Sequence, residues 1–513
     1  MNPVTAFTHT LHALALCSLA AYLHFEARYF LHMFQLNSYT ARVQWSWMRA
    51  NKTRMIPPLF ALIGAIGCGF ISARHAAYAY GFFALLCLVL AAFSLPKKAK
   101  KPLVFTARLC RLFVTLGILV LLLLALGVAL GSTGEFVLFG IVPFALPFLI
   151  PAANRINAPI EAAVRRHYTS DAKKILASCP NLQIIGITGS FGKTSVKYFL
   201  THLLSVRYNT LMTPESYNTP MGVVKTIRGQ LKPYHEVFVC EMGAQNVGDI
   251  KELCGIAGPR HGIITALGQQ HLESFKSQEN IIKTKYELAD ALPEDGFLLL
   301  NGDNELIRAN PPRHRFMTYG LNDENDYRAS DVKVSSRGTA FTLHTPDGQS
   351  CDFQTALLGE HNIVNLTGAL AMCHLLGISL TALKPRLLKI TAVPHRLQLI
   401  DHGSFAVIDD GFNSNPNGTQ AALRTLSLFD DYKIMITPGM VELGEAQETL
   451  NREFGQNAAR VCDYVILVGE KQTRPIARGL ADAGFPAEKL YIAESLKDGL
   501  EHAHALKTER KKI

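Results

Sequence analysis

The sequence lacks the features that mark metal-binding, disulfide-stabilised and disordered proteins. Its ten cysteines are scattered, form no CxxC pair and come no closer together than Cys240 and Cys254, so neither a zinc knuckle nor a disulfide framework is indicated. It has no low-complexity segment and no internal repeat, which argues against a disordered scaffold or a solenoid. The N-terminus "MNPVTAFTHTLH" has no basic segment before its apolar run, so we do not expect a cleaved signal peptide.

Acidic residues are few in residues 1–152, which are mostly apolar, whereas residues 153–513 have the composition of a soluble protein. The net charge of +10, from 51 Lys and Arg against 41 Asp and Glu, would suit a nucleic-acid-binding protein. Many of these bases, however, cluster between apolar stretches, and that pattern favours membrane orientation instead. We therefore expect a membrane protein with no nucleic-acid partner. At about 150 residues per domain, the length predicts three or four units.

Five apolar stretches predict about five transmembrane helices in residues 1–152, because each approaches the ~20 residues that cross a bilayer. The stretches lie around 8–30, 55–73, 77–95, 112–130 and 136–152. Several polar side chains stand near the end of the first stretch, and we expect them at the head-group level. These are His24, Glu26, Arg28 and His32.

The connections between the stretches predict an orientation. Clusters of Lys and Arg follow the first and third stretches, whereas the connections after the second and fourth, "ARHA" and "GSTGE", are short and nearly neutral. Basic loops stay in the cytoplasm, so we expect an external N-terminus and a cytoplasmic chain beyond residue 152, in an inner or plasma membrane. Residues 153–180 read as a basic juxtamembrane linker helix, which is either a solvated connector or lies against anionic head groups.

The stretch "LQIIGITGSFGKTSVKYFLTHLL" predicts a strand, a glycine-rich turn and a helix. Backbone amides of such a turn converge with the helix N-terminus on one point and bind phosphate there. Lys193 adds a positive charge, and the Thr194 hydroxyl can reach Mg²⁺. The alternative is a glycine-rich helix entry with an incidental lysine, but the strand–turn–helix context favours nucleotide binding.

Three further residues follow similar strand-and-helix patterns. Glu241 ends the buried strand of "HEVFVCEMGAQNVGDI", and a carboxylate at that end of a parallel strand faces the ligand crevice. His271 follows the strand of "GIITALGQQHLESF", and the helix "NIIKTKYEL" presents Lys285. Each residue alone also fits a structural role, as a helix cap or as an ordinary histidine or surface lysine.

Seven motifs together resemble the Mur ligases of peptidoglycan assembly, over about residues 181–505. In chain order they are "ITGSFGKTS", "ESYNTPMGV", "EMGAQNVGDI", "QQHLESFKSQENIIKTKYEL", "GEHNIVNLTGALA", "VPHRLQ" and "IDDGFNSNPNG". The pattern is most similar to the type that joins D-alanyl-D-alanine to a muramoyl tripeptide. The resemblance implies an α/β fold after the membrane anchor, with a P-loop central ATP-binding domain in 181–395 and a Rossmann-like C-terminal domain in 396–513.

The resemblance also implies an ATP-dependent amide-forming ligase with ATP, two Mg²⁺ ions and a carbamylated lysine. Lys193, Lys285 and His271 would be catalytic, and Lys285 would be the carbamylated lysine. One Mg²⁺ would lie on Thr194 and Glu241 and a second on His271 and Lys285. The residues implied to contact the nucleotide are Thr188, Gly189, Ser190, Phe191, Gly192, Lys193, Thr194, Asn362, Arg396 and Asp410.

The residues support the same chemistry independently. A carboxylate is a poor acylating agent, so ATP must first convert it to an acyl phosphate, and Mg²⁺ with Lys193 offsets charge on the transferring phosphoryl group. An amine then attacks and phosphate leaves. The partners implied are a muramoyl-peptide acceptor and an amino acid or dipeptide.

Three departures from the family pattern leave alternatives open. Membrane spans occupy the place of the usual domain that grips a UDP-sugar, so a lipid-linked acceptor is an alternative to a soluble one. "EMGAQN" lacks the basic pair common after this motif, and the chain stops at "HALKTERKKI", where a final strand would be expected. Other hypotheses are a ligase for another amino-acid polymer, as in poly-glutamate or cyanophycin synthesis, and a membrane ATPase without ligase activity.

Overall fold

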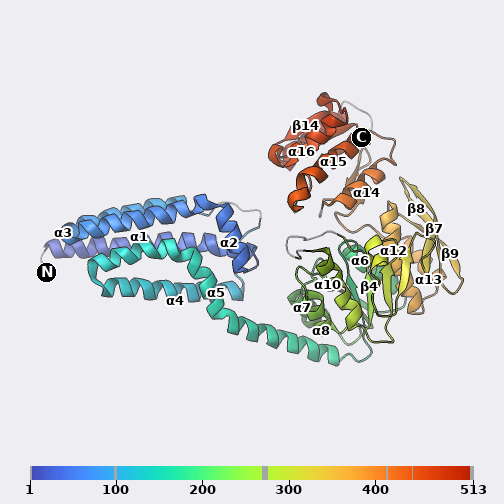
Figure 1. Ribbon diagram of the computed structural model, residues 1–513, viewed down its shortest axis with the longest axis horizontal. Coiled ribbons are helices and arrows are strands. Elements are labelled where there is room, and N and C mark those ends of the chain that lie inside the picture. Colours follow the sequence, from blue (N-terminus) through green and yellow to red (C-terminus); the bar gives the residue numbers. More distant parts are fainter. Residues whose placement is uncertain are drawn as a thin grey trace. The chain divides into compact units, whose positions relative to one another are not determined.

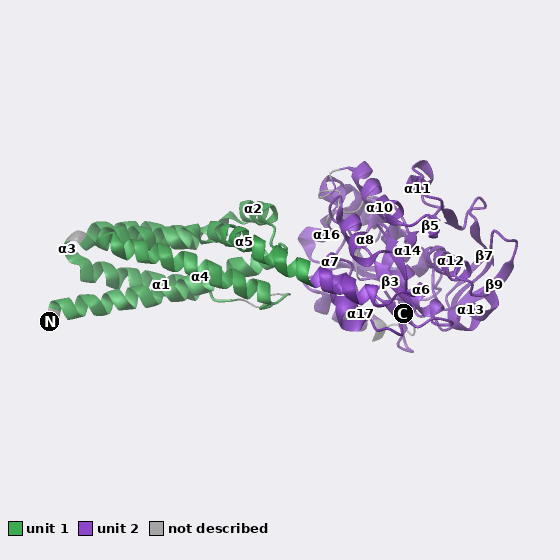
Figure 2. Cartoon of the chain, turned by 90° about the horizontal axis from the view of Figure 1, so that it is seen from below, with its two compact units in different colours: residues 1–167 green, residues 168–513 purple. Residues whose placement is uncertain are grey.

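The computed structural model describes residues 3–96, 101–268, 275, 277–411, 414–441 and 443–508. The chain divides into two compact units, residues 1–167 and residues 168–513 (Figure 2). All the secondary-structure elements described in the first unit are helices. The second unit contains all the described strands.

The first unit is a bundle of long apolar helices (Figure 1). Its elements are α1 (Pro3–Leu36), α2 (Ala41–Ala50), the short 3₁₀ turn η1 (Lys52–Met55), α3 (Ile56–Phe93), α4 (Ala107–Ala129) and α5 (Gly131–Ala177). Within the described residues, five segments are long and apolar enough to cross a membrane: Val4–Leu36, Lys52–Ser72, Arg74–Phe93, Ala107–Ala129 and Gly131–Ala177. Each predicted apolar stretch falls largely within one of them.

The helices keep one of the two predicted boundaries. The element α3 consists of two helices that meet at a kink, where His75 has a non-helical backbone (φ −141°, ψ 59°), so the second and third stretches are separate segments as predicted. The last stretch and the predicted linker, by contrast, form one continuous helix, α5, although it contains Pro143, Pro147, Pro151 and Pro159. Proline removes one backbone donor each time, but long apolar helices tolerate it where neighbouring groups satisfy the backbone.

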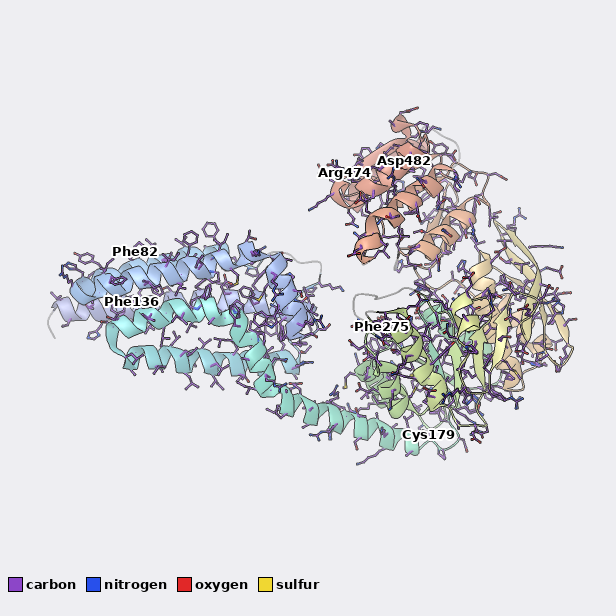
Figure 3. All side chains as sticks on the ribbon, in the orientation of Figure 1. Phe82, Phe136, Cys179, Phe275, Arg474 and Asp482 are labelled. Atoms are coloured by element: carbon purple, nitrogen blue, oxygen red, sulfur yellow. The ribbon has the colours of Figure 1, made fainter. Side chains whose placement is uncertain are left out.

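Side chains in the bundle separate into an inner and an outer set. Phe136 is fully buried between helices, whereas Phe82 is 57% exposed on the outer face (Figure 3). Glu26 has a partner within the bundle: its side chain is buried, and it accepts a hydrogen bond from the Ser94 hydroxyl at 2.8 Å. The sequence did not reveal this partner because Ser94 lies 68 residues away, just beyond α3.

The second unit is built on one large sheet with the strand order β2-β3-β1-β4-β5-β6-β7-β8-β9. Pairing is parallel from β2 to β7 and antiparallel from β7 to β9. The strands are β1 (Gln183–Thr188), β2 (Thr210–Met212), β3 (Val237–Glu241), β4 (His261–Ile264), β5 (Leu298–Asn301), β6 (Met317–Gly320), β7 (Tyr327–Ser335), β8 (Gly338–His344) and β9 (Ser350–Thr355).

Helices cover both faces of this sheet (Figure 1). They are α6 (Lys193–Leu204), α7 (Pro220–Gln230), α8 (Asp249–Ala257), α10 (Gln278–Ala291), α11 (Glu305–Ala309), α12 (Glu360–Leu375) and α13 (Leu380–Leu387). Alternate residues of a strand point to opposite faces, so Ile185 and Ile187 join the core with α6 and α12, whereas Ile184 joins the core with α7 and α8. Because β1, β3 and β4 run parallel, their carboxyl ends meet at one edge of the sheet. Ligands bind at this edge in open parallel sheets.

Residues from 398 onward form a smaller α/β region. The antiparallel pair β10 (Gln398–Asp401) and β11 (Ala406–Asp409) precedes a parallel sheet of β12 (Ile434–Thr437), β13 (Tyr464–Val468) and β14 (Leu490–Ala493). Its helices are α14 (Pro416–Leu426), α15 (Gln447–Ala459), α16 (Glu470–Asp482) and α17 (Leu496–Thr508), with short 3₁₀ turns η2 (Gly444–Ala446) and η3 (Ala487–Lys489). The predicted α/β class, with an apolar helical region before it, is confirmed.

Candidate active site

The loop between β1 and α6 has the backbone of a phosphate-binding turn. Gly189 (φ +146°) and Gly192 (φ +83°) adopt conformations that side chains disfavour. A Cβ on Gly189 would also lie 2.2 Å from Thr265 Oγ1, and one on Gly192 would lie 2.6 Å from Asn365 Oδ1. Glycine is therefore required at both positions, and the helix N-terminus that begins at Lys193 faces the same loop.

The rest of the loop is fastened to the segment after β4. The Ser190 amide donates to the Ala266 carbonyl at 2.6 Å, and its hydroxyl donates to the Gly268 carbonyl at 3.0 Å. The Thr265 hydroxyl donates to the Phe191 carbonyl. On the other side, the fully buried Thr188 hydroxyl donates to the Met242 carbonyl at 3.0 Å. These bonds attach the loop to the segments that follow β3 and β4.

Lys193 folds back over this loop. Its ammonium donates to the carbonyl oxygens of Gly189 at 2.7 Å and Ser190 at 3.1 Å. Burial of the ammonium lowers the pKa of Lys193 to about 8, although the side chain as a whole is only partly buried. Neutral carbonyls are weak partners for an ammonium, so a phosphate that entered the loop would compete well for it.

Glu241, at the end of β3, is 1% exposed and lies beside the loop. Its Oε1 accepts hydrogen bonds from the Thr194 hydroxyl and the Asn218 amide, each at 3.2 Å. Its Oε2 lies 3.0 Å from the Lys197 ammonium, but no donor in the described part of the chain makes a well-oriented hydrogen bond to it. A buried carboxylate oxygen with a free lone pair, next to a hydroxyl, suits a hard cation such as Mg²⁺.

Protein ligands beyond this pair are sparse. Within the described ranges, no group of three or more His, Cys, Asp and Glu residues could hold a metal ion by itself. Mg²⁺ is usually held by one or two carboxylates together with waters and substrate phosphates. His271, the predicted ligand of a second ion, lies outside the described residues.

Lys285 is buried, not an ordinary surface lysine. It lies on α10, is 3% exposed, and makes no hydrogen bond or ion pair with any described residue. Burial, and to a smaller extent the positive charge of Lys193, lowers the pKa of Lys285 to about 7. A substantial share of its amine is therefore neutral at neutral pH, and a neutral amine is the form that reacts with CO₂.

Arg396 and Asp410 belong electrostatically to the same site. Arg396 interacts with both Glu241 and Asp410, while burial lowers its pKa. Burial raises the pKa of Asp410 to about 6, and Asp410 Oδ1 accepts from the Leu397 amide at 3.2 Å. Their predicted contact with the nucleotide stays a prediction.

Asn362, a predicted nucleotide contact, is buried near the start of α12. Its side-chain amide donates to the Leu358 carbonyl at 2.8 Å, near the start of α12, and it is 4% exposed. One helical turn later, Asn365 lies against Gly192 of the phosphate loop. Sequence reasoning missed Asn365, although the i, i+3 spacing in "EHNIVN" puts both residues on the same side of a helix.

Lys197 and Asn218 were also missed. Both contact the Glu241 carboxylate, Lys197 from α6 and Asn218 from the segment before α7. The spacing of Lys193 and Lys197 indicates a shared helix face, but only the sheet order brings the "ESYNTP" segment next to β3. No local signal in the sequence could show that pairing.

Comparison with known proteins agrees with this geometry. Residues 187–373 match the family model of the Mur ligase middle domain, and residues 395–512 match that of the Mur ligase glutamate ligase domain. UDP-N-acetylmuramoyl-tripeptide--D-alanyl-D-alanine ligase of Escherichia coli is 33% identical over 325 residues, which are 61% of this chain and 70% of that protein. The Bacillus subtilis enzyme of the same name is 32% identical over 276 residues, 53% of this chain and 59% of that protein.

Solved structures give the same result. MurF from Acinetobacter baumannii is similar with a TM-score of 0.61 and 27% identity, over 67% of this chain and 74% of that one. MurF ligase from Thermotoga maritima in complex with ADP has a TM-score of 0.60 and 25% identity, over 68% of this chain and 78% of that one. With both domain models matched around a phosphate loop of the expected geometry, the chain belongs to the Mur ligase family of ATP-dependent ligases.

Proposed function

We propose that this protein is a membrane-tethered ligase that uses ATP to join D-alanyl-D-alanine to a muramoyl tripeptide in cell-wall precursor synthesis. The observation that carries the proposal is the convergence of the phosphate loop and the buried Glu241 at one sheet edge, with Lys285 electrostatically coupled to Lys193. The names of the matched E. coli and B. subtilis enzymes support the choice of substrates.

The site residues supply what acyl activation requires. The backbone amides at the start of α6 receive the phosphates of ATP, and Lys193 exchanges its carbonyl partners for phosphate oxygens. The acceptor carboxylate then attacks the terminal phosphorus, forming an acyl phosphate and ADP. The amine of D-alanyl-D-alanine attacks the acyl carbon, and an amide bond forms. Phosphate leaves and carries the carboxylate oxygen that had attacked the phosphorus.

Thr194 and Glu241 would hold Mg²⁺, which offsets negative charge on the transferring phosphoryl group when bound. Lys285 fits carbamylation because it is buried, lacks a described ion-pair partner and has a pKa near neutrality. Its neutral amine would add to CO₂ and release a proton, so that a cationic side chain becomes an anionic one. That anion would provide a second oxygen ligand set near the nucleotide.

The acceptor that the comparisons support is a soluble UDP-linked one. The names of the matched relatives specify a UDP-N-acetylmuramoyl tripeptide, and nothing in the comparisons supports a lipid-linked acceptor. Residues 1–186 lie outside both family-model matches. We therefore propose that the apolar helices serve as an anchor, with the ligase unit on the cytoplasmic side where ATP is present.

Phosphate release by detergent-purified protein tests the proposal. We expect ATP-dependent release only when UDP-muramoyl tripeptide and D-alanyl-D-alanine are both present. Replacement of the tripeptide by a lipid-linked precursor is expected to give no release above background. Equal release without any acceptor would indicate a membrane ATPase, and release with glutamate or aspartate polymers instead would indicate a ligase for another polymer.

A further inference from the structure

Lys197 is a fully buried lysine next to the proposed metal ligand. It lies on α6, one turn after Lys193, and its side chain is 0% exposed. Its ammonium lies 3.0 Å from Glu241 Oε2 and donates a hydrogen bond to the Glu215 carbonyl. A buried charge is costly unless it is paired, so these two contacts explain how the ammonium is retained there.

The Glu215 carbonyl belongs to the loop 213–219, which joins β2 to α7. Glu215 has a φ of +42°, in the left-handed region that residues with side chains disfavour. The loop therefore needs an external contact to keep this backbone conformation, and the Lys197 ammonium is such a contact.

The same loop touches Glu241 and its neighbours at three further points. The Asn218 amide donates to Glu241 Oε1 at 3.2 Å, and the Asn218 carbonyl accepts from the Gly243 amide at 2.8 Å. The Thr213 hydroxyl accepts from the Glu241 backbone amide at 3.1 Å. Lys197 thus joins a loop and a carboxylate that already contact each other.

Lys193 and Lys197 have different surroundings. The Lys193 ammonium contacts backbone carbonyls of the phosphate loop and is free to move to a phosphate. The Lys197 ammonium is held between a carboxylate and a loop carbonyl and is enclosed, so it reaches no ligand directly. Any effect of Lys197 on the reaction must pass through Glu241 and the loop 213–219.

We propose that Lys197 is a positioning residue that ties Glu241 to the loop 213–219 and so holds the carboxylate ready to receive Mg²⁺ with the nucleotide. This inference rests on the proposed function, because it assumes that Glu241 binds Mg²⁺. It predicts that loss of Lys197 raises the Mg²⁺ concentration that nucleotide binding requires. Simple repulsion between the lysine and a cation would predict the opposite.

The test is Mg²⁺-dependent binding of a fluorescent ATP analogue to the detergent-purified full chain. For Lys197→Met, we expect the half-saturating Mg²⁺ concentration to rise at least fivefold, with nucleotide binding in EDTA changed less than twofold. Lys197→Arg, which keeps a cation, is expected to show a smaller rise. Asn218→Ala removes one of the contacts to Glu241 and is expected to raise the Mg²⁺ requirement about twofold to threefold.

Lys225→Met is the matched control. The Lys225 ammonium contacts the Tyr217 hydroxyl of the same loop at 3.1 Å, but Lys225 is exposed and does not contact Glu241. We expect its Mg²⁺ requirement to equal that of the unmodified chain. A fold-only role for Lys197 would instead lower the melting temperature of Lys197→Met and leave its Mg²⁺ requirement unchanged.

The outcomes separate this inference from the proposed function. An unchanged or lowered Mg²⁺ requirement in Lys197→Met overturns the inference alone, provided that the unmodified chain needs Mg²⁺ for tight nucleotide binding. If Lys197→Met does not fold, an unchanged requirement in Asn218→Ala overturns it instead. Nucleotide binding by the unmodified chain that shows no Mg²⁺ dependence would overturn both the inference and the proposed function.

Discussion

At the scale of single residues, Lys285 shows how burial changes the chemistry of a side chain. A lysine on the surface of α10 would be a solvated cation, whereas the burial of Lys285 lowers its pKa to about 7 and leaves its amine available to react. The sequence could place this lysine on a helix but could not show which face of the helix is covered. The burial of Lys285 therefore became known only from the structure.

We expect Lys285→Arg to lose ligation almost completely, because arginine keeps a positive charge but cannot form a carbamate. By analogy with the removal of one preorganised electrostatic group, the loss in kcat is ~100-fold or more, on the order of 3 kcal/mol. Steady-state ligation kinetics measure it, with Lys283→Arg as the control, an exposed lysine two residues earlier on the same helix. Full activity in Lys285→Arg would exclude a carbamate at this position.

The same residue predicts a pH dependence. Because the pKa of Lys285 is lowered to about 7, its neutral share falls as the pH decreases through neutrality. We expect ligation to fall from pH 8 to pH 6, and added bicarbonate to move this decline to lower pH by mass action. Asp410, whose pKa is raised to about 6 by burial, would add a decline that bicarbonate does not move. A profile insensitive to bicarbonate would contradict the carbamate.

At the scale of elements, the phosphate loop requires glycine where its backbone turns. We expect Gly192→Ala to raise the dissociation constant of ATP at least tenfold, because the new Cβ would meet Asn365 at a φ of +83°. The left-handed conformation alone costs about 1–2 kcal/mol for a residue with a side chain. Nucleotide titration and thermal unfolding measure both effects.

Gly229→Ala is the control for this substitution. Gly229 lies in α7, and a Cβ there would have nothing within 4 Å. Alanine in a helix is favoured over glycine by roughly 0.5–1 kcal/mol, so this variant is expected to unfold at the same or a higher temperature and to bind ATP normally. Equal weakening of ATP binding in both variants would show that the contact with Asn365 does not matter.

The elements predicted best were those with strong local patterns. The β-branched run, glycine turn and apolar helix of residues 183–204 appear as β1, the loop and α6. The continuity of α5 from the last apolar stretch into the linker was not foreseen, because proline normally ends a helix. The order of strands, which brings Asn218 beside Glu241, depends on contacts far apart in the chain.

At the scale of the whole molecule, the apolar helices and the ligase unit predict a defined topology. Basic residues lie in the connections after the first and third apolar stretches, so we expect the bend near residue 75 to be external and residue 155 to be cytoplasmic. Reporter fusions after residues 75 and 155 are expected to report opposite compartments. Identical signals from the two fusions would contradict the five-span topology.

Family membership was predictable from the sequence because seven motifs occur in order, whereas the site needed the folded chain. Glu241 and the phosphate loop were identified from strand-end patterns, and the structure brings them within hydrogen-bonding reach through Thr194. The contacts of Lys197 and Asn218 with Glu241 were not predictable, since these residues come together only after the sheet forms.

The fate of the acceptor's carboxylate oxygens tests the central claim most directly. UDP-muramoyl tripeptide labelled with ¹⁸O in its terminal carboxylate would be converted with ATP and D-alanyl-D-alanine, and the released phosphate analysed by mass spectrometry. If the carboxylate attacks the terminal phosphorus and phosphate later leaves the acyl carbon, one ¹⁸O atom is expected in each phosphate released. Unlabelled phosphate would show that water attacks ATP instead, and would contradict an acyl-phosphate ligase.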